Sequence, residues 1–406
     1  MVAEMPAGHC RSASPRLNRS AAGEVRVSMR NGGLLGLAGV LALVVACSGG
    51  VVPNPGGRAP LAAETQTDAP GPIVSMPVPV ARPLPATNAA PARLRAEVDR
   101  LIAGFPGKAG AAIRAVDDGW TVQRGGALSM PQQSVSKLWV ALTVLSQRDA
   151  GKLRLDDPVL VTTNDLTLFH QPIASLVRGE GYQTTVMGLL TRALTQSDNT
   201  ANDRLLTLVG GPSAVRAFIA EHQLGAIRFG PGERLLQSGT AGLTWNQSMA
   251  MGRGFEAARA RLSPQVRAAA MQRYIDNPPD GAAPLAIADA LARLARGDLL
   301  SETSTRVMLD TMGASITGRA RLRAALPAGW KIAHKTGTGQ ELAGRNAGFN
   351  DVGLLTAPDG KRYAVAVMIG DTRAPMRERQ QLIQNVAAAL TGGRAGASVG
   401  EDASDG

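Results

Sequence analysis

The sequence predicts an α/β protein, built as an α+β sandwich in which one antiparallel sheet lies beside a mainly helical subdomain. Three observations lead to this fold class. Helical periodicity dominates from about 136 to 325. Extended segments precede this stretch and return after it, at 111–116, 120–124, 330–336, 350–357 and 362–370. The sheet is therefore expected to be completed by N- and C-terminal segments of the domain and to be flanked by helices.

Short local patterns predict the elements at the two ends of the domain. Residues 91–104 carry apolar side chains at helical spacing, including Leu94, Val98 and Leu101. Asp117-Asp118-Gly119 joins the first two extended segments, and Pro358-Asp359-Gly360 joins the last two. The glycine in each turn supplies the positive φ that a tight hairpin needs. A final amphipathic helix is predicted over 375–391.

Composition limits the function classes. The chain has 406 residues, 44% of them hydrophobic, which is enough for a large core. The formal charge is +11, but the arginines are scattered and no basic run is interleaved with aromatic residues, so nucleic-acid binding is not expected. Apart from the adjacent His9 and Cys10, the four histidines and two cysteines lie far apart in the sequence. We therefore predict no metal site and no cofactor.

The first 47 residues are predicted to be a leader. The apolar run at 34–46 is too short to span a membrane but suits the core of a signal peptide. Met29, followed by an arginine, is a natural start of translation. Residues 1–28 are therefore interpreted either as the result of a start codon placed too early or as an extended n-region of the signal peptide. The run ends at Cys47 in a pattern that resembles the lipobox of bacterial lipoproteins. This resemblance implies lipidation of Cys47; the alternative is an incidental cysteine. Ser48 after it favours a periplasmic location on the outer membrane of a Gram-negative cell.

The regions that flank the domain lack the composition of a folded core. Residues 48–90 are rich in proline, alanine and glycine and are predicted to form an extended tether. Residues 393–406 are predicted to be a disordered tail. The pattern Gly396-Ala-Ser398-Val-Gly400 matches a nucleophile elbow, but it lacks the strand-turn-helix setting that such an elbow requires. We therefore reject Ser398 and place the globular domain at 91–392.

Three motifs inside the domain carry the chemistry. They are Ser134-Val-Ser-Lys137, Ser197-Asp198-Asn199 and Lys335-Thr336-Gly337. Each motif alone is weak evidence for a function, because the same residues also occur at a helix cap, in a turn or at the end of a strand. Together and in this order, they form the signature of β-lactamases and penicillin-binding proteins.

These residue types suit an acyl-transfer reaction. Ser134 is expected to open a helix, with Lys137 one turn away and able to hydrogen-bond it. A lysine crowded by other cations loses its proton more easily and helps to activate a hydroxyl. Ser197 can relay a proton to the leaving nitrogen, and Asn199 can hold both the substrate and Lys137. Lys335 supplies a cation for a substrate carboxylate.

Longer stretches extend the resemblance across nearly all of 91–392. Residues 196–202 and 326–339 look like the corresponding stretches of class A β-lactamases, within the penicillin-recognising serine enzymes. The resemblance implies the transpeptidase-like fold and an acyl-enzyme on Ser134. It also implies an oxyanion hole made by the backbone N–H groups of Ser134 and Thr338, and a substrate-binding strand that includes Thr336 and Gly337.

Glu233 is the candidate general base. Class A enzymes carry this glutamate in an Ω-loop, in the pattern E-x-x-L-N, and Glu233-Arg-Leu-Leu-Gln237 lies 36 residues after Ser197. Arg228 fits the usual arginine of that loop. The resemblance implies that Glu233 activates the deacylating water; the alternative is an ordinary surface glutamate.

Three departures from the family pattern surround Glu233. Gln237 replaces the usual asparagine at a substrate-side position, and its longer amide is a candidate to displace the water. Gly230 and Pro231 replace an Asp and an Arg whose ion pairs hold the loop in many class A enzymes, which predicts a looser loop. Residues 240–275 are predicted to be an insertion that either lines the cleft or decorates the surface.

Phe169 is the candidate gating aromatic at the substrate site.

Three hypotheses for the function remain. The first is a β-lactamase, acylated at Ser134 and deacylated through Glu233. The second is a D,D-peptidase or esterase that acts on cell-wall peptides. The third is a penicillin-binding sensor module that turns over too slowly to be an enzyme. In each case the expected state is a monomer, tethered to the membrane by a lipid on Cys47.

Overall fold

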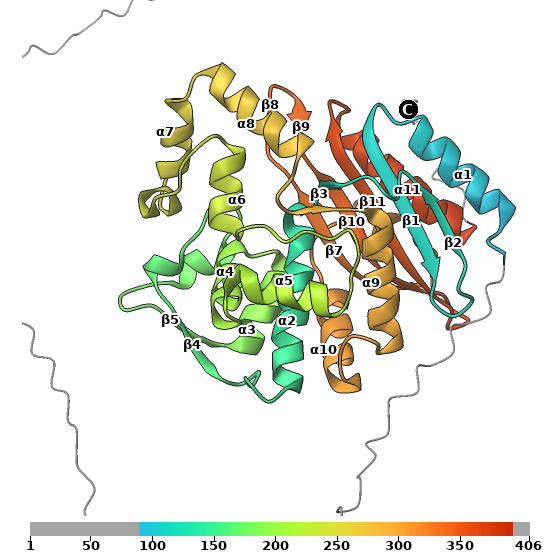
Figure 1. Cartoon of the computed structure of the whole chain (residues 1–406), viewed down its shortest axis with the longest axis horizontal. Helices are drawn as coiled ribbons and strands as arrows, with labels where there is room; N and C mark the ends of the chain where they lie inside the picture. The colour runs from blue at the N-terminus through green and yellow to red at the C-terminus, as the bar shows by residue number, and fades with distance from the viewer. Residues whose placement is uncertain (1–88, 393–406) are drawn as a thin grey trace, which may run out of the picture. The chain divides into compact units, whose positions relative to one another are not determined.

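The computed structural model describes residues 89–392 (Figure 1). Its main sheet runs in the order β2-β1-β11-β10-β7, with each pair of neighbours antiparallel, and β9 pairs with both β11 and β8. The strands of this sheet are β1 (Gly107–Ala115), β2 (Thr121–Arg124), β7 (Lys331–Thr338), β8 (Glu341–Leu342), β9 (Arg345–Asn346), β10 (Phe349–Thr356) and β11 (Arg362–Thr372). The prediction of one antiparallel sheet made from both ends of the domain is confirmed.

Helices fill most of the chain between the early and late strands. The α-helices are α1 (Ala92–Ala103), α2 (Lys137–Asp149), α3 (Val186–Thr191), α4 (Asn199–Leu208), α5 (Gly211–Glu221), α6 (Glu233–Thr240), α7 (Gly254–Ala260), α8 (Pro264–Asp276), α9 (Pro284–Arg296), α10 (Glu302–Gly313) and α11 (Met376–Thr391). The shorter turns are η1 (Gln133–Ser136), η2 (Thr163–Asp165), η3 (Pro172–Leu176), η4 (Arg192–Gln196), η5 (Gln247–Ala250) and η6 (Leu322–Ala325). Two small sheets were not predicted: β3 (Met130–Pro131) with β6 (Gly281–Ala282), and β4 (Pro158–Val161) with β5 (Tyr182–Thr185).

The sheet separates two apolar layers. Successive side chains of a strand point to opposite faces, and β11 shows this directly. Its Val365 and Val367 join the cluster formed with α1 and α11, whereas Ala366 and Met368 join the cluster that contains α9 and α2 (Figure 1). The sheet is thus buried on both faces.

Helix α2 is the centre of the helical subdomain. Nine consecutive residues, from Lys137 to Leu145, are buried. A helix that is buried all round must be enclosed by other elements, and α4, α5 and α10 surround α2. Its N-terminus meets the edge strand β7 through η1, so the three motifs converge at this junction.

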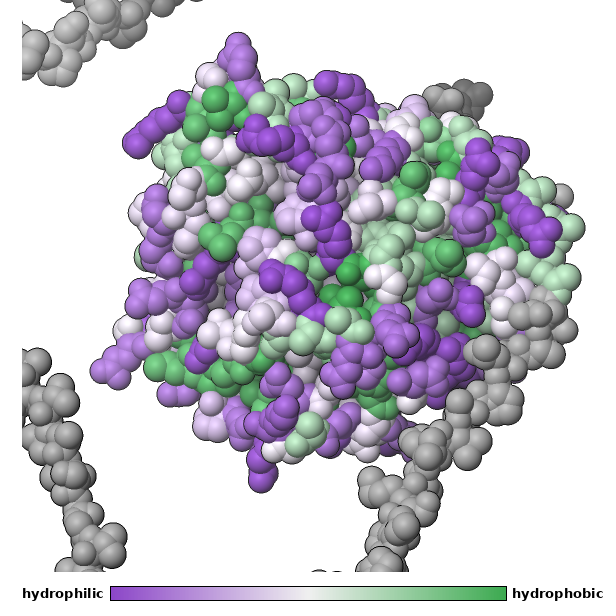
Figure 2. Space-filling model, viewed as in Figure 1, coloured by the Kyte–Doolittle hydropathy of each residue, from purple (hydrophilic) through white to green (hydrophobic). Residues whose placement is uncertain are grey.

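The region predicted as an insertion is folded. Residues 240–275 contain η5, α7 and most of α8. On the face seen in Figure 2, hydrophilic side chains are scattered among small apolar areas. Within residues 89–392, no helix is long and apolar enough to cross a membrane. The leader, Cys47, almost all of the tether at 48–90 and the tail at 393–406 lie outside the described residues.

Candidate active site

Ser134 lies in the 3-10 turn η1, directly before α2. It therefore precedes the α-helix by one tight turn instead of occupying its first turn. The side-chain amide of Asn350 on β10 donates to the carbonyl oxygens of Pro131 and Gln132, at 2.9 and 3.0 Å. The preceding residue, Gln133, has a φ of 54°, which is uncommon for a residue other than glycine. The turn is thus held in a strained form that presents Ser134 toward the cleft.

Lys137 connects Ser134 to two other polar side chains. Its buried Nζ donates to Ser134 Oγ and to Asn199 Oδ1, both at 2.9 Å. It also forms a short ion pair with Glu233 Oε1. Ser134 and Lys137 are three residues apart, whereas Asn199 and Glu233 come from α4 and α6. Four of the predicted catalytic and binding residues therefore meet at one ammonium group.

The second motif forms a sharp junction between η4 and α4. Ser197 adopts the left-handed conformation, with φ 61° and ψ 31°. Asp198 caps α4, because its carboxylate accepts the N–H of Ala201 at 3.0 Å and that of Ile173 at 2.6 Å. Asn199 donates its side-chain amide to the carbonyl oxygen of Leu168 at 2.8 Å. These bonds fix Ser197 and Asn199 at the wall of the cleft.

Lys335 on β7 faces Ser197 from the opposite wall. Its Nζ donates to Ser197 Oγ at 2.9 Å and to the carbonyl oxygen of Thr336 at 2.9 Å. The side chain is fully buried. Burial, followed by the nearby charge of Lys137, holds the pKa of Lys335 well below its usual value. An anion bound here favours the protonated form of this lysine.

The rest of β7 is held by an arginine that the sequence did not single out. Arg321 donates to the carbonyl oxygen of Gly337 at 3.0 Å and to Thr338 Oγ1 at 2.5 Å. Burial lowers its pKa to about 10, so it stays a cation at neutral pH. Thr336 pairs its hydroxyl with that of Thr317 at 2.9 Å. No motif marks Arg321, which lies 16 residues before Gly337.

Glu233 is the first residue of α6 and is only 2% exposed, so it is not a surface glutamate. Asp203 on α4 accepts the backbone N–H groups of Glu233 and Arg234, at 2.9 and 3.2 Å. Burial and the charge of Glu233 raise the pKa of Asp203 to about 6. Asp203 follows Asn199 by four residues, which places both on one helix face. That spacing is the signal by which the sequence reveals this residue.

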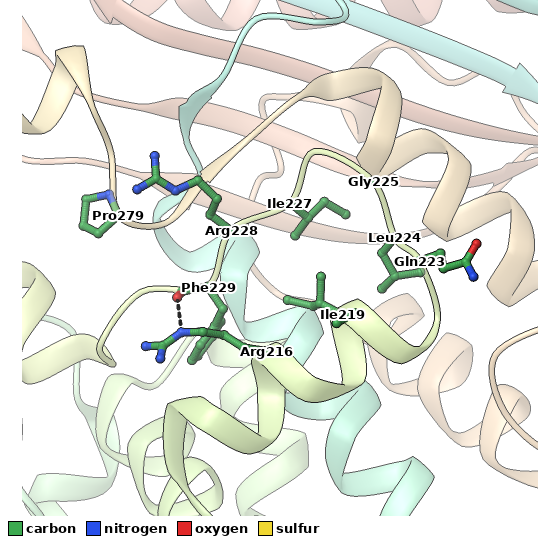
Figure 3. A pocket seen from close by; sticks show the side chains of 10 residues that line it. Arg216, Ile219, Gln223, Leu224, Gly225, Ile227, Arg228, Phe229 and Pro279 are labelled. Atoms are coloured by element: carbon green, nitrogen blue, oxygen red, sulfur yellow. Dashed lines mark hydrogen bonds between the residues drawn. The ribbon is translucent and has the colours of Figure 1, made fainter.

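The loop before Glu233 is held without the missing ion pairs. Arg216 on α5 donates to the carbonyl oxygens of Phe229 and Gly230, at 3.1 and 3.4 Å. Figure 3 shows the first of these bonds beside a cavity of about 490 Å³, whose lining does not include Ser134. The carbonyl oxygen of Arg228 accepts the side-chain amide of Gln132 at 2.9 Å. Side-chain hydrogen bonds to backbone carbonyl oxygens thus hold this loop in place of ion pairs.

Gln237 lies one turn after Glu233 on α6. Its Nε2 donates to Glu233 Oε2 at 3.1 Å and to Gln133 Oε1 at 3.2 Å. Gln340, just after β7, donates to the backbone and side-chain oxygens of Gln237 at 2.8 and 3.2 Å. The amide of Gln237 is therefore fixed among other polar groups. Its displacement of a water and its contact with substrate remain predictions.

Phe169 lies where the insertion meets the helical subdomain. Its φ is 58°, its side chain is 45% exposed, and its ring packs edge-on against Phe255 of α7 with centroids 4.7 Å apart. Its neighbours contact the second motif: Leu168 and His170 both offer carbonyl oxygens to Asn199. The role of Phe169 as a gate for substrate remains a prediction.

Asp280, directly before β6, is a buried carboxyl that the sequence analysis missed. Its Oδ2 accepts the N–H of Gln133 at 2.8 Å and the hydroxyl of Tyr274 at 3.1 Å. Its Oδ1 is buried and has no hydrogen-bond partner in the described part of the chain. Burial raises the pKa of Asp280 from 3.8 to about 6.

This pKa predicts a pH-dependent contribution to stability. The folded state binds the proton of Asp280 more tightly than the unfolded state does, so the contribution is complete below pH 3.8 and is lost as the pH rises through about 6. Asp280→Asn removes this titration. We expect the free energy of unfolding of the wild type, relative to that of Asp280→Asn, to rise by roughly 2 to 3 kcal/mol between about pH 8 and pH 4. Urea denaturation of both proteins at each pH measures this difference in the free energy of unfolding. A difference that does not change with pH contradicts the raised pKa of Asp280.

Among residues 89–392, no group of three or more His, Cys, Asp or Glu side chains is arranged to hold a metal ion. The residues that converge on Ser134 are hydroxyls, amides, cations and carboxylates, which are the groups of a hydrolytic site.

Comparisons with known proteins agree with this geometry. The model of the β-lactamase enzyme family matches residues 93–392. The extended-spectrum β-lactamase PER-1 of Pseudomonas aeruginosa is 30% identical over 302 residues, which cover 74% of this chain and 87% of that protein. The β-lactamase VEB-1 of the same species is 24% identical over 301 residues, covering 74% and 90% of the two chains.

Solved structures show the same architecture. A β-lactamase from Chitinophaga pinensis has a TM-score of 0.60 and 28% identity, covering 74% of this chain and 98% of that one. An ancestral class A β-lactamase has a TM-score of 0.57 and 28% identity, covering 74% and 99%. The family model, the relatives and the fold coincide, and the chain belongs to the β-lactamase enzyme family.

Proposed function

We propose that this protein is a class A serine β-lactamase that hydrolyses the lactam amide through an acyl-enzyme on Ser134. One observation carries the proposal: a single buried ammonium, on Lys137, contacts Ser134 Oγ, Asn199 Oδ1 and Glu233 Oε1 together. A nucleophile and a base joined in this way are the requirement for covalent catalysis. The carboxylate of Glu233 then serves the second half of the reaction, which requires a water.

Acylation uses the groups around Lys137. Ser134 Oγ attacks the lactam carbonyl carbon, and its proton passes to the carboxylate of Glu233 through Lys137, which gives one proton to Glu233 Oε1 and takes the proton of Ser134. The backbone N–H groups of Ser134 and Thr338 are the proposed oxyanion hole. The C–N bond breaks, and the nitrogen takes a proton from Ser197, which Lys335 contacts at 2.9 Å. The proton that Ser134 gave up is passed back to Ser197, so Glu233 is again a carboxylate before deacylation. Ser134 is then an ester.

Lys335 and its neighbours are the proposed site for the substrate carboxylate. Lys335 and Arg321 bring two cations to one side of β7, and the hydroxyls of Thr336 and Thr338 lie on the same strand. A carboxylate bound there offsets the repulsion between Lys335 and Lys137. It also fixes the orientation of the lactam ring relative to Ser134.

Deacylation is assigned to Glu233. Its Oε2 is held by Gln237 at 3.1 Å, and its backbone is held by Asp203 at 2.9 Å. A positioned carboxylate removes a proton from water as the water attacks the ester carbonyl. The ester bond breaks and the proton returns to Ser134 Oγ, which restores the free enzyme.

Hydrolysis of a chromogenic cephalosporin by the full chain tests the proposal, with intact-mass spectrometry on the same sample. Multiple turnovers are expected. A stable mass adduct without turnover contradicts the β-lactamase assignment and favours a penicillin-binding sensor or a peptidase. Hydrolysis of a D-alanyl-D-alanine peptide in the same conditions distinguishes those two.

The proposed domain organisation places this enzyme in the cell envelope. A signal peptide ends at Cys47, a tether covers 48–90, and the catalytic domain covers 91–392. We propose that the protein is exported to the periplasm as a monomer, with a lipid on Cys47 anchored in the outer membrane. The apolar run before Cys47 and the extended composition of the tether support this arrangement.

A Cys47→Ser variant is expected to lose the membrane anchor. Expressed in a Gram-negative host with labelled palmitate, the wild type should carry the label and sediment with membranes. The variant should lack the label and appear in the soluble periplasmic fraction with its hydrolytic activity intact. Label retained on Cys47→Ser contradicts lipidation at this residue.

A further inference from the structure

We propose that Tyr274, on helix α8 of the 240–275 insertion, is a positioning residue for deacylation. The inference rests on the proposed function, because it concerns the geometry of Glu233 after Ser134 has been acylated. The insertion then belongs to the catalytic machinery instead of decorating the surface. A chain of buried hydrogen bonds runs from Tyr274 through Gln133 and Gln237 to the carboxylate of Glu233.

The hydroxyl of Tyr274 is buried and makes two hydrogen bonds, one as an acceptor and one as a donor. It accepts a hydrogen bond from Gln133 Nε2 at 2.8 Å and donates one to Asp280 Oδ2 at 3.1 Å. Asp280 in turn accepts the backbone N–H of Gln133 at 2.8 Å. Tyr274 and Asp280 therefore hold the side chain and the backbone of Gln133 at once.

Gln133 needs this support because of its conformation. It precedes Ser134, it is 1% exposed, and its φ is 54°. A buried residue persists in a strained backbone conformation only when its surroundings fix it. Its side-chain amide has three partners: Tyr274, the carbonyl oxygen of Ala347 at 3.0 Å and Gln237 at 3.2 Å.

Gln237 completes the path to the general base. Its Nε2 lies between Gln133 Oε1 at 3.2 Å and Glu233 Oε2 at 3.1 Å. The orientation of Gln133 thus determines where Gln237 places its donor. That donor fixes the oxygen of Glu233 that is not paired with Lys137. This oxygen, Oε2, is the group that must align with the attacking water.

Removing the hydroxyl of Tyr274 should slow deacylation selectively. In Tyr274→Phe, Gln133 Nε2 loses one of two acceptors and Asp280 loses a donor, in a site that water does not reach freely. We expect kcat for a chromogenic cephalosporin to fall about tenfold, with KM falling in parallel and kcat/KM changing less than about twofold. Intact-mass spectrometry should show acyl-enzyme accumulating during turnover.

Tyr363→Phe is the matched control. Tyr363 lies on β11 and packs against Trp120 and Trp330, away from Ser134, so its kinetics should equal those of the wild type. Wild-type kcat in Tyr274→Phe, or an equal fall in kcat and kcat/KM, overturns the inference. Absence of turnover in the wild type overturns the proposed function instead.

A second variant covers the case in which Tyr274→Phe does not fold. Gln133→Met keeps the length of the side chain but removes the amide between Tyr274 and Gln237. It should accumulate acyl-enzyme to a similar degree. Where both single variants fold, the double variant should be no slower than the slower single one, because both changes break one path. Additive losses contradict the path.

Discussion

Ser134→Ala is expected to abolish hydrolysis of β-lactams and covalent labelling by a fluorescent penicillin. The change removes the one hydroxyl that Lys137 contacts at 2.9 Å, so no acyl-enzyme forms. Loss of a nucleophile costs roughly 10⁶-fold in kcat in the serine protease subtilisin, and a loss of at least about 10⁴-fold is expected here. Gel fluorescence and a chromogenic cephalosporin measure the two effects.

Ser398→Ala provides the control. Ser398 is the serine of the nucleophile-elbow pattern at 396–400, which lies in the tail outside the described residues. Its replacement should leave labelling and turnover at wild-type levels. Persistent labelling of Ser134→Ala, at wild-type stoichiometry, rules out Ser134 as the nucleophile.

Glu233→Ala is expected to trap the acyl-enzyme. Removing a general base slows the step that it serves by roughly 10²–10⁴-fold. Acylation should continue in part, because Lys137 retains its contacts with Ser134 and Asn199. Intact-mass spectrometry should therefore show one stoichiometric adduct that persists for far longer than the turnover time of the wild type.

A surface glutamate supplies the comparison for Glu233. Glu221 is the exposed last residue of α5. The Glu221→Ala variant should hydrolyse substrate at the wild-type rate. Unchanged turnover in Glu233→Ala excludes Glu233 as the base. If Glu233→Ala loses both covalent labelling and turnover, Glu233 acts in acylation instead.

Much of this site was predictable because short motifs reflect local geometry. A serine and a lysine three residues apart meet on one helical turn, as Ser134 and Lys137 do. The sheet was predictable for a similar reason, because β10 and β11 are neighbouring extended segments joined by a short turn that contains Asp359 and Gly360. The candidate role of Glu233 came from the family pattern, whereas its contact with Lys137, 96 residues away, was not predicted.

The supporting contacts were not predictable, because they join residues without a common motif. Tyr274 lies 141 residues from Gln133, and nothing around either residue indicates the other. The loop before Glu233 gives a second example. The sequence shows that its usual ion-pair residues are missing, but not that Arg216 binds the carbonyl oxygens of Phe229 and Gly230 in their place.

The pairing of β1 with β11 has a consequence for biosynthesis. β1 is among the first segments of the domain to leave the ribosome, whereas β11 and the covering helix α11 are among the last. The central ladder, and the apolar layer under α1, therefore cannot close until almost the whole domain has been made. Such a nascent chain stays open for most of its synthesis, which is the state that a chain threaded through a membrane pore must keep.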